Sequence, residues 1–168
     1  MYHLLCPNKI VNSLYDIKAH NLQCLGIRGI IFDLDNTIIP WDQQEMSPEI
    51  IQWLQTLLSQ GFHLCLVSNN MGNRVQGIAA ILGIPCISKA YKPTNAGFLK
   101  AMVKMELSTK EVAVVGDQLF TDILGGNRLG LYTIWVKPLS TQEFIGTKIT
   151  RRVEKLTVRL LRHKGLLK

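Results

Sequence analysis

Short runs of apolar residues alternate along this chain with longer stretches in which apolar residues recur every three or four positions. The short runs are typical of buried strands, and the longer stretches are typical of amphipathic helices. Strands are expected at residues 29–32, 62–67, 86–88, 112–115 and 132–136. Helices are expected at residues 48–60, 72–82, 94–105 and 122–129.

Residues with strong preferences at helix ends support these boundaries. Ser47 and Pro48 supply an N-cap and a first-turn proline for the first helix, and Gly61 is typical of the position just beyond a helix end. Ser108 and Glu111 have the spacing of a capping box, but only a short apolar run follows them. We therefore predict a turn at these residues and a strand directly after it.

The alternation of strands and helices predicts an α/β fold in three layers, with a central parallel sheet and helices on both faces. In such sheets, ligands bind outside the carboxyl ends of the strands. Asp33, Ser68, Lys92 and Asp117 each lie just beyond a predicted strand. We therefore expect these four side chains to share one edge of the sheet.

Length and composition indicate one folded unit. The chain has 168 residues, 47% of them hydrophobic, and contains no long linker or internal repeat. We divide it into an N-terminal extension that packs on the core (1–28), a catalytic domain (29–139) and a basic amphipathic C-terminal segment (140–168). No apolar run approaches the roughly 18 residues of a membrane-spanning helix, and the start lacks a signal-peptide pattern, so we expect a cytoplasmic protein. The four cysteines lack metal-ligand spacing and are expected to be reduced thiols.

Positive charge is concentrated near the C-terminus. Residues 148–168 contain 8 of the 19 Lys and Arg residues beside a single acidic residue, and the rest of the chain has 11 basic and 11 acidic residues. Between the basic positions, Val153, Leu156, Leu160 and Leu161 recur at helical intervals. Such a helix can lie on an anionic membrane, or it can pack on the domain with its basic face in water. RNA is a further polyanionic partner, disfavoured because the segment lacks aromatic residues that stack on bases.

Two polar loops carry closely spaced carboxylates. Asp33 and Asp35 follow the first predicted strand, and Asp117 and Asp122 follow the fourth. Alternate residues beyond a strand end lie on the same side, so the carboxylates of Asp33 and Asp35 can converge on one cation. Since neighbouring carboxylates repel each other, they need that cation. We therefore predict a Mg²⁺ site at this edge.

Four motifs appear in order along the chain. They are Asp33-Leu34-Asp35-Asn36-Thr37, Ser68-Asn69-Asn70, Lys92-Pro93, and Gly116-Asp117 with Asp122. As a set, they resemble the motifs of the haloacid dehalogenase (HAD) superfamily of phosphohydrolases. The resemblance covers residues 29–137 and implies a HAD-like Rossmannoid fold and hydrolysis of a phosphate monoester.

The resemblance also implies roles for the carboxylates. Asp33 would be the nucleophile that forms an aspartyl-phosphate, and Asp35 would be the general acid and then the base. Asp33, Asp117 and the backbone carbonyl of Asp35 would hold Mg²⁺. Asp122 would support the metal site or its lysine.

The remaining motif residues would bind phosphate, whose negative charge must be neutralised and held in position. The Ser68 hydroxyl and the Asn69 amide can donate to phosphate oxygens, and Lys92 adds a positive charge. Arg74 and Lys89 lie near the second and third motifs and are candidates for binding a second phosphate of a phosphodiester headgroup.

The spacing of the motifs leaves no room for a large cap domain. Only 30 residues separate Thr37 from Ser68, and 23 separate Ser68 from Lys92. The active site is therefore expected to be open. Superfamily members without a cap typically act on large substrates, because a macromolecule or a membrane closes the site instead.

The segment 116–130, together with Ser68-Asn69-Asn70 and Arg74, resembles the YqeG family of HAD subfamily IIIA, which is similar to the mitochondrial phosphatidylglycerophosphate phosphatase. This implies conversion of phosphatidylglycerophosphate to phosphatidylglycerol at the inner face of a membrane. One alternative is a HAD phosphatase for a soluble or nucleic-acid phosphate monoester. Another is a non-enzymatic phospho-receiver or scaffold, although Asp35 would give an aspartyl-phosphate a base for rapid hydrolysis.

Overall fold

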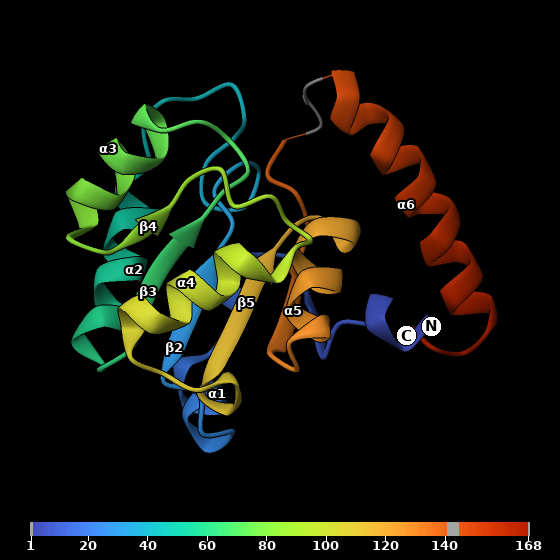
Figure 1. Ribbon diagram of the computed structural model, residues 1–168, viewed down its shortest axis with the longest axis horizontal. Helices are drawn as coiled ribbons and strands as arrows, with labels where there is room; N and C mark the ends of the chain where they lie inside the picture. Colours follow the sequence, from blue (N-terminus) through green and yellow to red (C-terminus); the bar gives the residue numbers. More distant parts are fainter. Residues whose placement is uncertain (1, 141–144, 168) are drawn as a thin grey trace.

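The computed structural model describes residues 2–140 and 145–167; residues 141–144 and 168 of the predicted C-terminal segment lie outside this range. Six parallel strands form one central sheet in the order β1-β6-β5-β2-β3-β4 (Figure 1). The strands are β1 (Lys9–Val11), β2 (Gly29–Phe32), β3 (His63–Val67), β4 (Cys86–Ile87), β5 (Val112–Gly116) and β6 (Tyr132–Val136). The α-helices are α1 (Ala19–Cys24), α2 (Pro48–Ser59), α3 (Asn73–Leu82), α4 (Asn95–Met105), α5 (Leu124–Arg128) and α6 (Ile145–His163).

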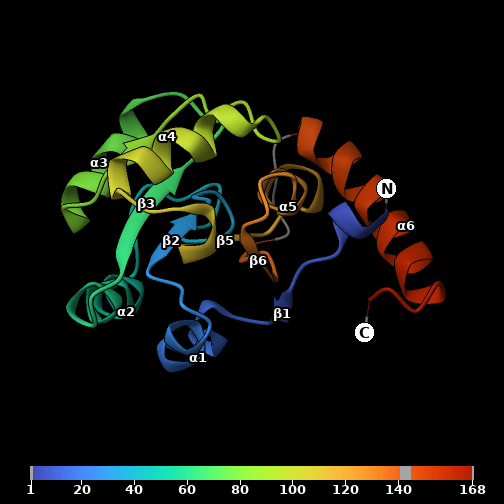
Figure 2. The same ribbon diagram turned by 60° about the horizontal axis from the view of Figure 1, so that its bottom comes forward.

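Helices cover both faces of the sheet (Figure 2). Successive strand residues point to opposite faces, and here both faces are apolar. Ile30 and Phe32 of β2 belong to a core cluster with residues of α1, α2 and α3, whereas Ile31 belongs to a second cluster with residues of α4. The predicted three-layer α/β fold with a parallel sheet is therefore confirmed.

The local predictions agree with the structure in most elements. The Ser47 side chain accepts a hydrogen bond from the backbone N–H of Ile50 and caps α2. The turn at residues 108–111 is a short 3-10 helix (Thr109–Glu111) with a complete capping box. The helix predicted at 122–129 begins earlier, because Leu119–Ile123 forms a π-helical turn that leads directly into α5.

One strand was not predicted. Residues Lys9–Val11 form β1, which pairs with β6 at the edge of the sheet. Three residues are too few for a periodic signal, and Lys9 interrupts the apolar pattern. The described residues thus form six strands, whereas the hydrophobic pattern predicts five.

The intervals between the motifs contain only elements of the core. Residues 38–91, all of them described, form α2, β3, α3 and β4 and the loops that join them. As expected, no large cap domain is inserted there. The carboxyl ends of the central strands are therefore not covered by a domain inserted at residues 38–91.

Helix α6 packs against the domain beside α5 and the N-terminal segment (Figures 1 and 2). Its Leu161 is fully buried in a small apolar cluster with Leu119 and Ile123. Val153, Leu156 and Leu160 remain 48%, 63% and 43% exposed, so α6 both packs on the domain and keeps an apolar stripe outside. Within the described residues, no helix has the length and apolar character needed to cross a membrane.

Candidate active site

The four motifs meet at the carboxyl edge of the sheet. Asp33 follows β2 and Asp117 follows the neighbouring strand β5, and the backbone N–H of Asp33 donates to the carbonyl of Val115 at 2.9 Å. Ser68 follows β3 on the other side of β2. A pocket of about 440 Å³ opens at this edge. It is lined by Asp33, Asp35, Asn36, Trp41, Ser68, Asn69, Asn70, Lys92, Gln118 and Thr121.

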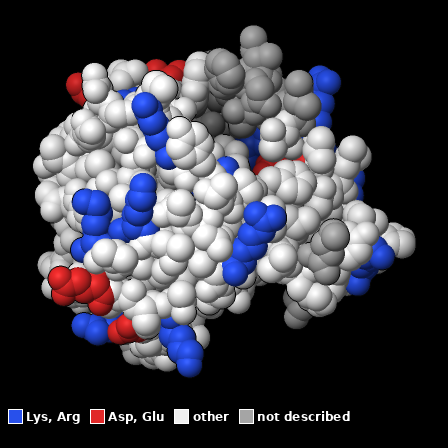
Figure 3. Space-filling model, in the orientation of Figure 1, with Lys and Arg blue, Asp and Glu red and all other residues white. Residues whose placement is uncertain are grey.

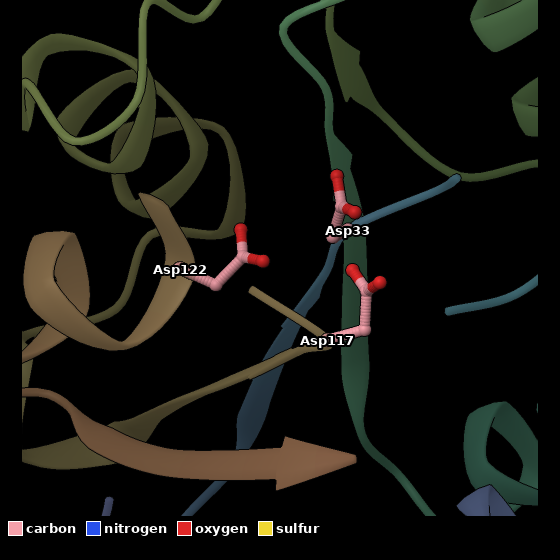
Figure 4. A group of neighbouring side chains, drawn as sticks. All are labelled: Asp33, Asp117 and Asp122. Carbon is pink, nitrogen blue, oxygen red and sulfur yellow. The ribbon is translucent and has the colours of Figure 1, made fainter. Parts of the chain in front are cut away.

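Three carboxylates converge beside the pocket (Figure 4). One ligand atom from each of Asp33, Asp117 and Asp122 lies within 4.8 Å of the others, and all three residues are buried. Lys92 Nζ donates to Asp33 Oδ1 at 2.6 Å and to Asp122 Oδ1 at 2.7 Å. The lysine ammonium therefore bridges two of the three carboxylates.

The ionisation of these groups reflects their burial and their mutual charges. Burial raises the pKa of Asp33 to about 7, Lys92 opposes this increase, and the charge of Asp122 adds to it. Burial also raises the pKa of Asp117, against the effect of the Arg151 charge. Burial alone would lower the pKa of Lys92, but the charges of Asp122 and Asp33 outweigh it and raise that pKa. The lysine therefore stays protonated.

A glycine makes room for the acidic cluster. A Cβ on Gly116 would lie 2.3 Å from Cγ of Asp122 and 2.4 Å from its Oδ2. The Asp122 carboxylate also accepts a hydrogen bond from the backbone N–H of Gln118 at 3.1 Å. Gly116 thus allows Asp122 to fold back against the end of β5 and reach Lys92.

Asn69 joins the second motif to the third. Its side-chain oxygen accepts from the Lys92 backbone N–H at 2.7 Å, and its amide donates to the Lys92 carbonyl at 3.2 Å. This two-point contact fixes the backbone that carries the lysine. Sequence reasoning assigned Asn69 to phosphate binding through its own amide, and the role of its side chain in positioning Lys92 was missed.

Asp35 has several polar partners of its own. Its carboxylate forms an ion pair with Arg74 and accepts from Asn70 Nδ2 at 2.7 Å, and the Ser68 hydroxyl lies 3.5 Å from it. Arg74 also donates to the Gln43 carbonyl at 2.6 Å and to that of Pro40. Arg74 therefore ties Asp35 to the loop before α2, whereas the sequence suggested a second phosphate as its partner. The structure brings Asp35, Ser68 and Arg74 together.

Lys89 is the candidate that lies apart from this group. It is exposed and does not line the pocket that contains Lys92 and Ser68. Its backbone N–H donates to the Asn70 carbonyl, which holds the loop.

The C-terminal helix also reaches the site, which the sequence did not indicate. Arg151 of α6 forms an ion pair with Asp117, and Glu154 accepts a hydrogen bond from the backbone N–H of Leu119 at 2.6 Å. The basic pattern of this segment indicated only a charged face. A single acidic residue among eight basic ones was the one signal for a buried role of Glu154.

The donor set suits a small hard cation. Mg²⁺ prefers oxygen ligands and is usually bound by one or two carboxylates together with water and phosphate oxygens. Asp33 and Asp117 follow adjacent strands and supply two such carboxylates, and Asp122 adds a third beside them. Lys92 contacts one oxygen of Asp33 and one of Asp122. The residues present therefore fit a Mg²⁺ ion.

Comparison with known proteins gives matches along most of the chain. A family model described as mitochondrial PGP phosphatase matches residues 2–139. The chain is 39% identical over 159 residues to the probable phosphatase YqeG of Bacillus subtilis, covering 95% of this chain and 92% of the relative. It is 29% identical over 165 residues to the chloroplastic phosphatidylglycerophosphate phosphatase 1 of Chlamydomonas reinhardtii, covering 92% of this chain and 61% of that relative, less than two thirds of its length.

A solved structure shares the fold. A haloacid dehalogenase-like hydrolase from Streptococcus pneumoniae superposes with a TM-score of 0.52 at 16% identity, covering 70% of this chain and 88% of the other. At this low sequence identity, the similarity shows only that the two proteins share the arrangement of the sheet and helices.

Proposed function

Because the chain belongs to the mitochondrial PGP phosphatase family, we propose that its substrate is phosphatidylglycerophosphate and its product phosphatidylglycerol. The predicted resemblance to the HAD superfamily and the YqeG family is confirmed, and the chain is a phosphoric monoester hydrolase of that type. The observation that carries the proposal is the cluster of buried carboxylates and Lys92 at an uncapped sheet edge. An open site of this kind accepts a phosphate on a large or membrane-bound molecule.

Asp33 is the proposed nucleophile. A carboxylate that attacks phosphorus forms an aspartyl-phosphate and divides a difficult transfer into two easier steps. The Oδ1 atom of Asp33 is engaged by Lys92 Nζ at 2.6 Å, which orients the carboxylate toward the pocket it lines. The same ammonium can bind the incoming phosphate and offset its charge.

Asp35 is the proposed proton donor to the leaving oxygen and then the base that activates water. It lines the same pocket as Asp33, and Asn70 and Arg74 fix the orientation of its carboxylate. The Ser68 hydroxyl and the Asn69 backbone amide are the proposed donors to the phosphate oxygens. Asn69 has a second task, because its side chain holds the backbone of Lys92.

Mg²⁺ is the proposed cofactor. Asp33, Asp117 and the backbone carbonyl of Asp35 would hold it, with Asp122 as support through Lys92. When bound, the ion supplies positive charge to the phosphoryl oxygens and helps to align them for attack. The chain itself supplies the anionic ligands and the second cation, Lys92.

We further propose that the outer face of α6 contacts an anionic membrane, which would place the protein at the cytoplasmic surface of a bilayer. Val153, Leu156 and Leu160 are exposed there, among basic side chains along the edge formed by α6 (Figure 3). Apolar burial combined with basic charge is the usual basis of interfacial binding. In a flotation assay with phosphatidylglycerol vesicles, the wild type and a Val103→Asp control on α4 should rise with the vesicles. The Leu156→Asp variant should stay at the bottom of the gradient.

The function is tested by phosphate release from phosphatidylglycerophosphate in mixed micelles with Mg²⁺, beside a panel of soluble sugar and nucleotide phosphates. We expect turnover of the lipid far above the panel. Asp33→Asn should abolish it, whereas Asp42→Asn, which removes an exposed carboxylate outside the pocket, should leave it unchanged. Equal turnover of the lipid and the soluble compounds would favour the alternative of a soluble phosphate monoester.

A further inference from the structure

Helix α6 lies beyond the residues that the family model matches, yet two of its side chains reach the acidic cluster. Arg151 and Glu154 are three residues apart and therefore occupy the same face of the helix. Glu154 is 2% exposed, which is unusual for a carboxylate unless it is paired. These two residues connect the C-terminal helix to the loop that follows β5.

Arg151 contacts both the backbone and the side chain of Asp117. Its Nη1 donates to the Asp117 carbonyl at 2.5 Å, and its Nη2 forms an ion pair with Asp117 Oδ2. Trp135 Nε1 donates to the same carbonyl at 2.8 Å. The other carboxylate oxygen, Oδ1, accepts a 3.4 Å hydrogen bond from the Thr37 hydroxyl. The orientation of Asp117 is thus set by three side chains from three separate segments.

Glu154 contacts both Arg151 and the start of the π-helical turn at Leu119–Ile123. Its Oε2 accepts from Arg151 Nη1 at 2.9 Å. Its Oε1 accepts from the backbone N–H groups of Leu119 at 2.6 Å and Phe120 at 3.3 Å. Glu154 therefore fixes the arginine and satisfies two N–H groups at the start of the π-helical turn that carries Asp122.

We propose that Arg151, oriented by Glu154, is a positioning residue that holds the Asp117 carboxylate for the Mg²⁺ ion. The inference rests on the magnesium-dependent function proposed above. A guanidinium is planar and permanently charged, and it binds two oxygens in fixed geometry. By holding Oδ2 and the backbone carbonyl, Arg151 would fix the carboxylate of Asp117 and leave Oδ1 as its oxygen for the ion.

Charge balance supports this assignment. Asp33, Asp117 and Asp122 bring three negative charges into a buried cluster, and Lys92 contacts only the first and last of them. Arg151 supplies the cation for Asp117. Groups that hydrogen-bond to a metal ligand orient it, and their removal typically weakens metal affinity by about 10–100-fold.

The test is isothermal titration of Mg²⁺ into the full-length, metal-free protein, so the readout does not depend on substrate or turnover. Arg151→Ala should raise the Mg²⁺ Kd by about 10–100-fold. Arg152→Ala is the matched control, because it removes the same charge from the adjacent, exposed position and should leave the Kd unchanged. Arg151→Lys should restore affinity only in part, since an ammonium cannot replace the two-point contact.

Steady-state kinetics provide a second readout. In Arg151→Ala, saturating Mg²⁺ should restore most of kcat, while the KM for Mg²⁺ stays high. A general loss of stability would not change the KM for Mg²⁺ while leaving kcat nearly intact. An unchanged or tighter Mg²⁺ Kd in folded Arg151→Ala would overturn the inference, and the tighter value would make the arginine a competitor of the ion. If Arg151→Ala fails to fold, a wild-type Kd in Arg151→Lys would overturn it equally.

The titration also separates this inference from the proposed function. Asp117→Asn removes the proposed ligand itself and should abolish Mg²⁺ binding. If the wild type binds no Mg²⁺, the proposed magnesium-dependent function fails as well. If the wild type binds Mg²⁺, Asp117→Asn does not, and Arg151→Ala binds as the wild type does, the function stands and only the role of Arg151 is wrong.

Discussion

Replacing Lys92 by methionine should destabilise the metal-free protein strongly. The Lys92 side chain is 3% exposed and contacts Asp33 at 2.6 Å and Asp122 at 2.7 Å, whose side chains are 7% and 1% exposed. Methionine fills similar space but leaves two buried carboxylates without their shared cation. Removal of one partner from a buried ion pair typically costs about 3–5 kcal/mol. We expect a loss of that size in the free energy of unfolding at pH 8.

The loss should depend on pH and on Mg²⁺. Even with Lys92 present, burial raises the pKa of Asp33 from 3.8 to about 7, so the folded state binds the proton more tightly than the unfolded state does. The free energy of unfolding therefore falls as the pH rises from about 4 to about 7. At lower pH the protonated Asp33 no longer repels the neighbouring carboxylates. Loss of the Lys92 charge should raise the Asp33 pKa further, so the deficit of Lys92→Met should shrink as the pH falls toward 7, where Asp33 becomes protonated in both proteins. If Mg²⁺ is the cofactor, as proposed, it should stabilise the variant, since a ligand that binds the folded state shifts the equilibrium toward it.

Urea unfolding followed by circular dichroism measures the effect, with Lys89→Met as the control. Lys89 is three residues away and exposed, so its replacement should change stability by no more than about 0.5 kcal/mol. A loss below about 1 kcal/mol for Lys92→Met at pH 8, or a loss equal to that of the control, would refute the reasoning that Lys92 neutralises buried carboxylates.

Two further predictions concern packing and exposure. Gly116→Ala should cost about 1–3 kcal/mol in chemical unfolding, because its Cβ would overlap the buried Asp122 side chain, whereas Gly77→Ala has open space within a helix and should stabilise by about 0.5–1 kcal/mol. A neutral Gly116→Ala would show that Asp122 moves freely. With an aromatic disulfide reagent at neutral pH, exposed Cys24 should react quickly, while Cys65, which is buried and has a pKa raised to about 12, should react only after unfolding. Rapid modification of Cys65 in the folded protein would contradict its burial.

The central sheet could be predicted because its signals are local. Apolar runs, the Ser47 cap and the polar residues just after the strands each involve only a few neighbouring positions. Parallel pairing then places the carboxyl ends of β2, β3 and β5 at one edge of the sheet, independently of the conformation of the loops. The positions of Asp33, Ser68 and Asp117 follow from that rule.

The finer contacts of the site could not be predicted, because they join distant segments. Arg151 lies 34 positions after Asp117 in the sequence, and Lys92 lies 23 positions after Asn69. The amphipathic pattern of α6 groups Leu161 with Leu160, although the first is buried and the second is exposed. Periodicity identifies a helix but does not identify the side chains that its neighbours cover.

The central proposal is that Asp33 takes a phosphoryl group from phosphatidylglycerophosphate. Its most direct test is mass spectrometry of the Asp35→Asn variant after a single turnover with this lipid and Mg²⁺. Asp35→Asn removes both the proton donor to the leaving oxygen and the base that activates water, so the aspartyl-phosphate should form slowly and then persist. We therefore expect a phosphoryl adduct on the peptide that contains Asp33 and none in a variant that also carries Asp33→Asn. Release of phosphate from the lipid at the wild-type rate by Asp35→Asn, with no adduct on Asp33, would contradict the proposal.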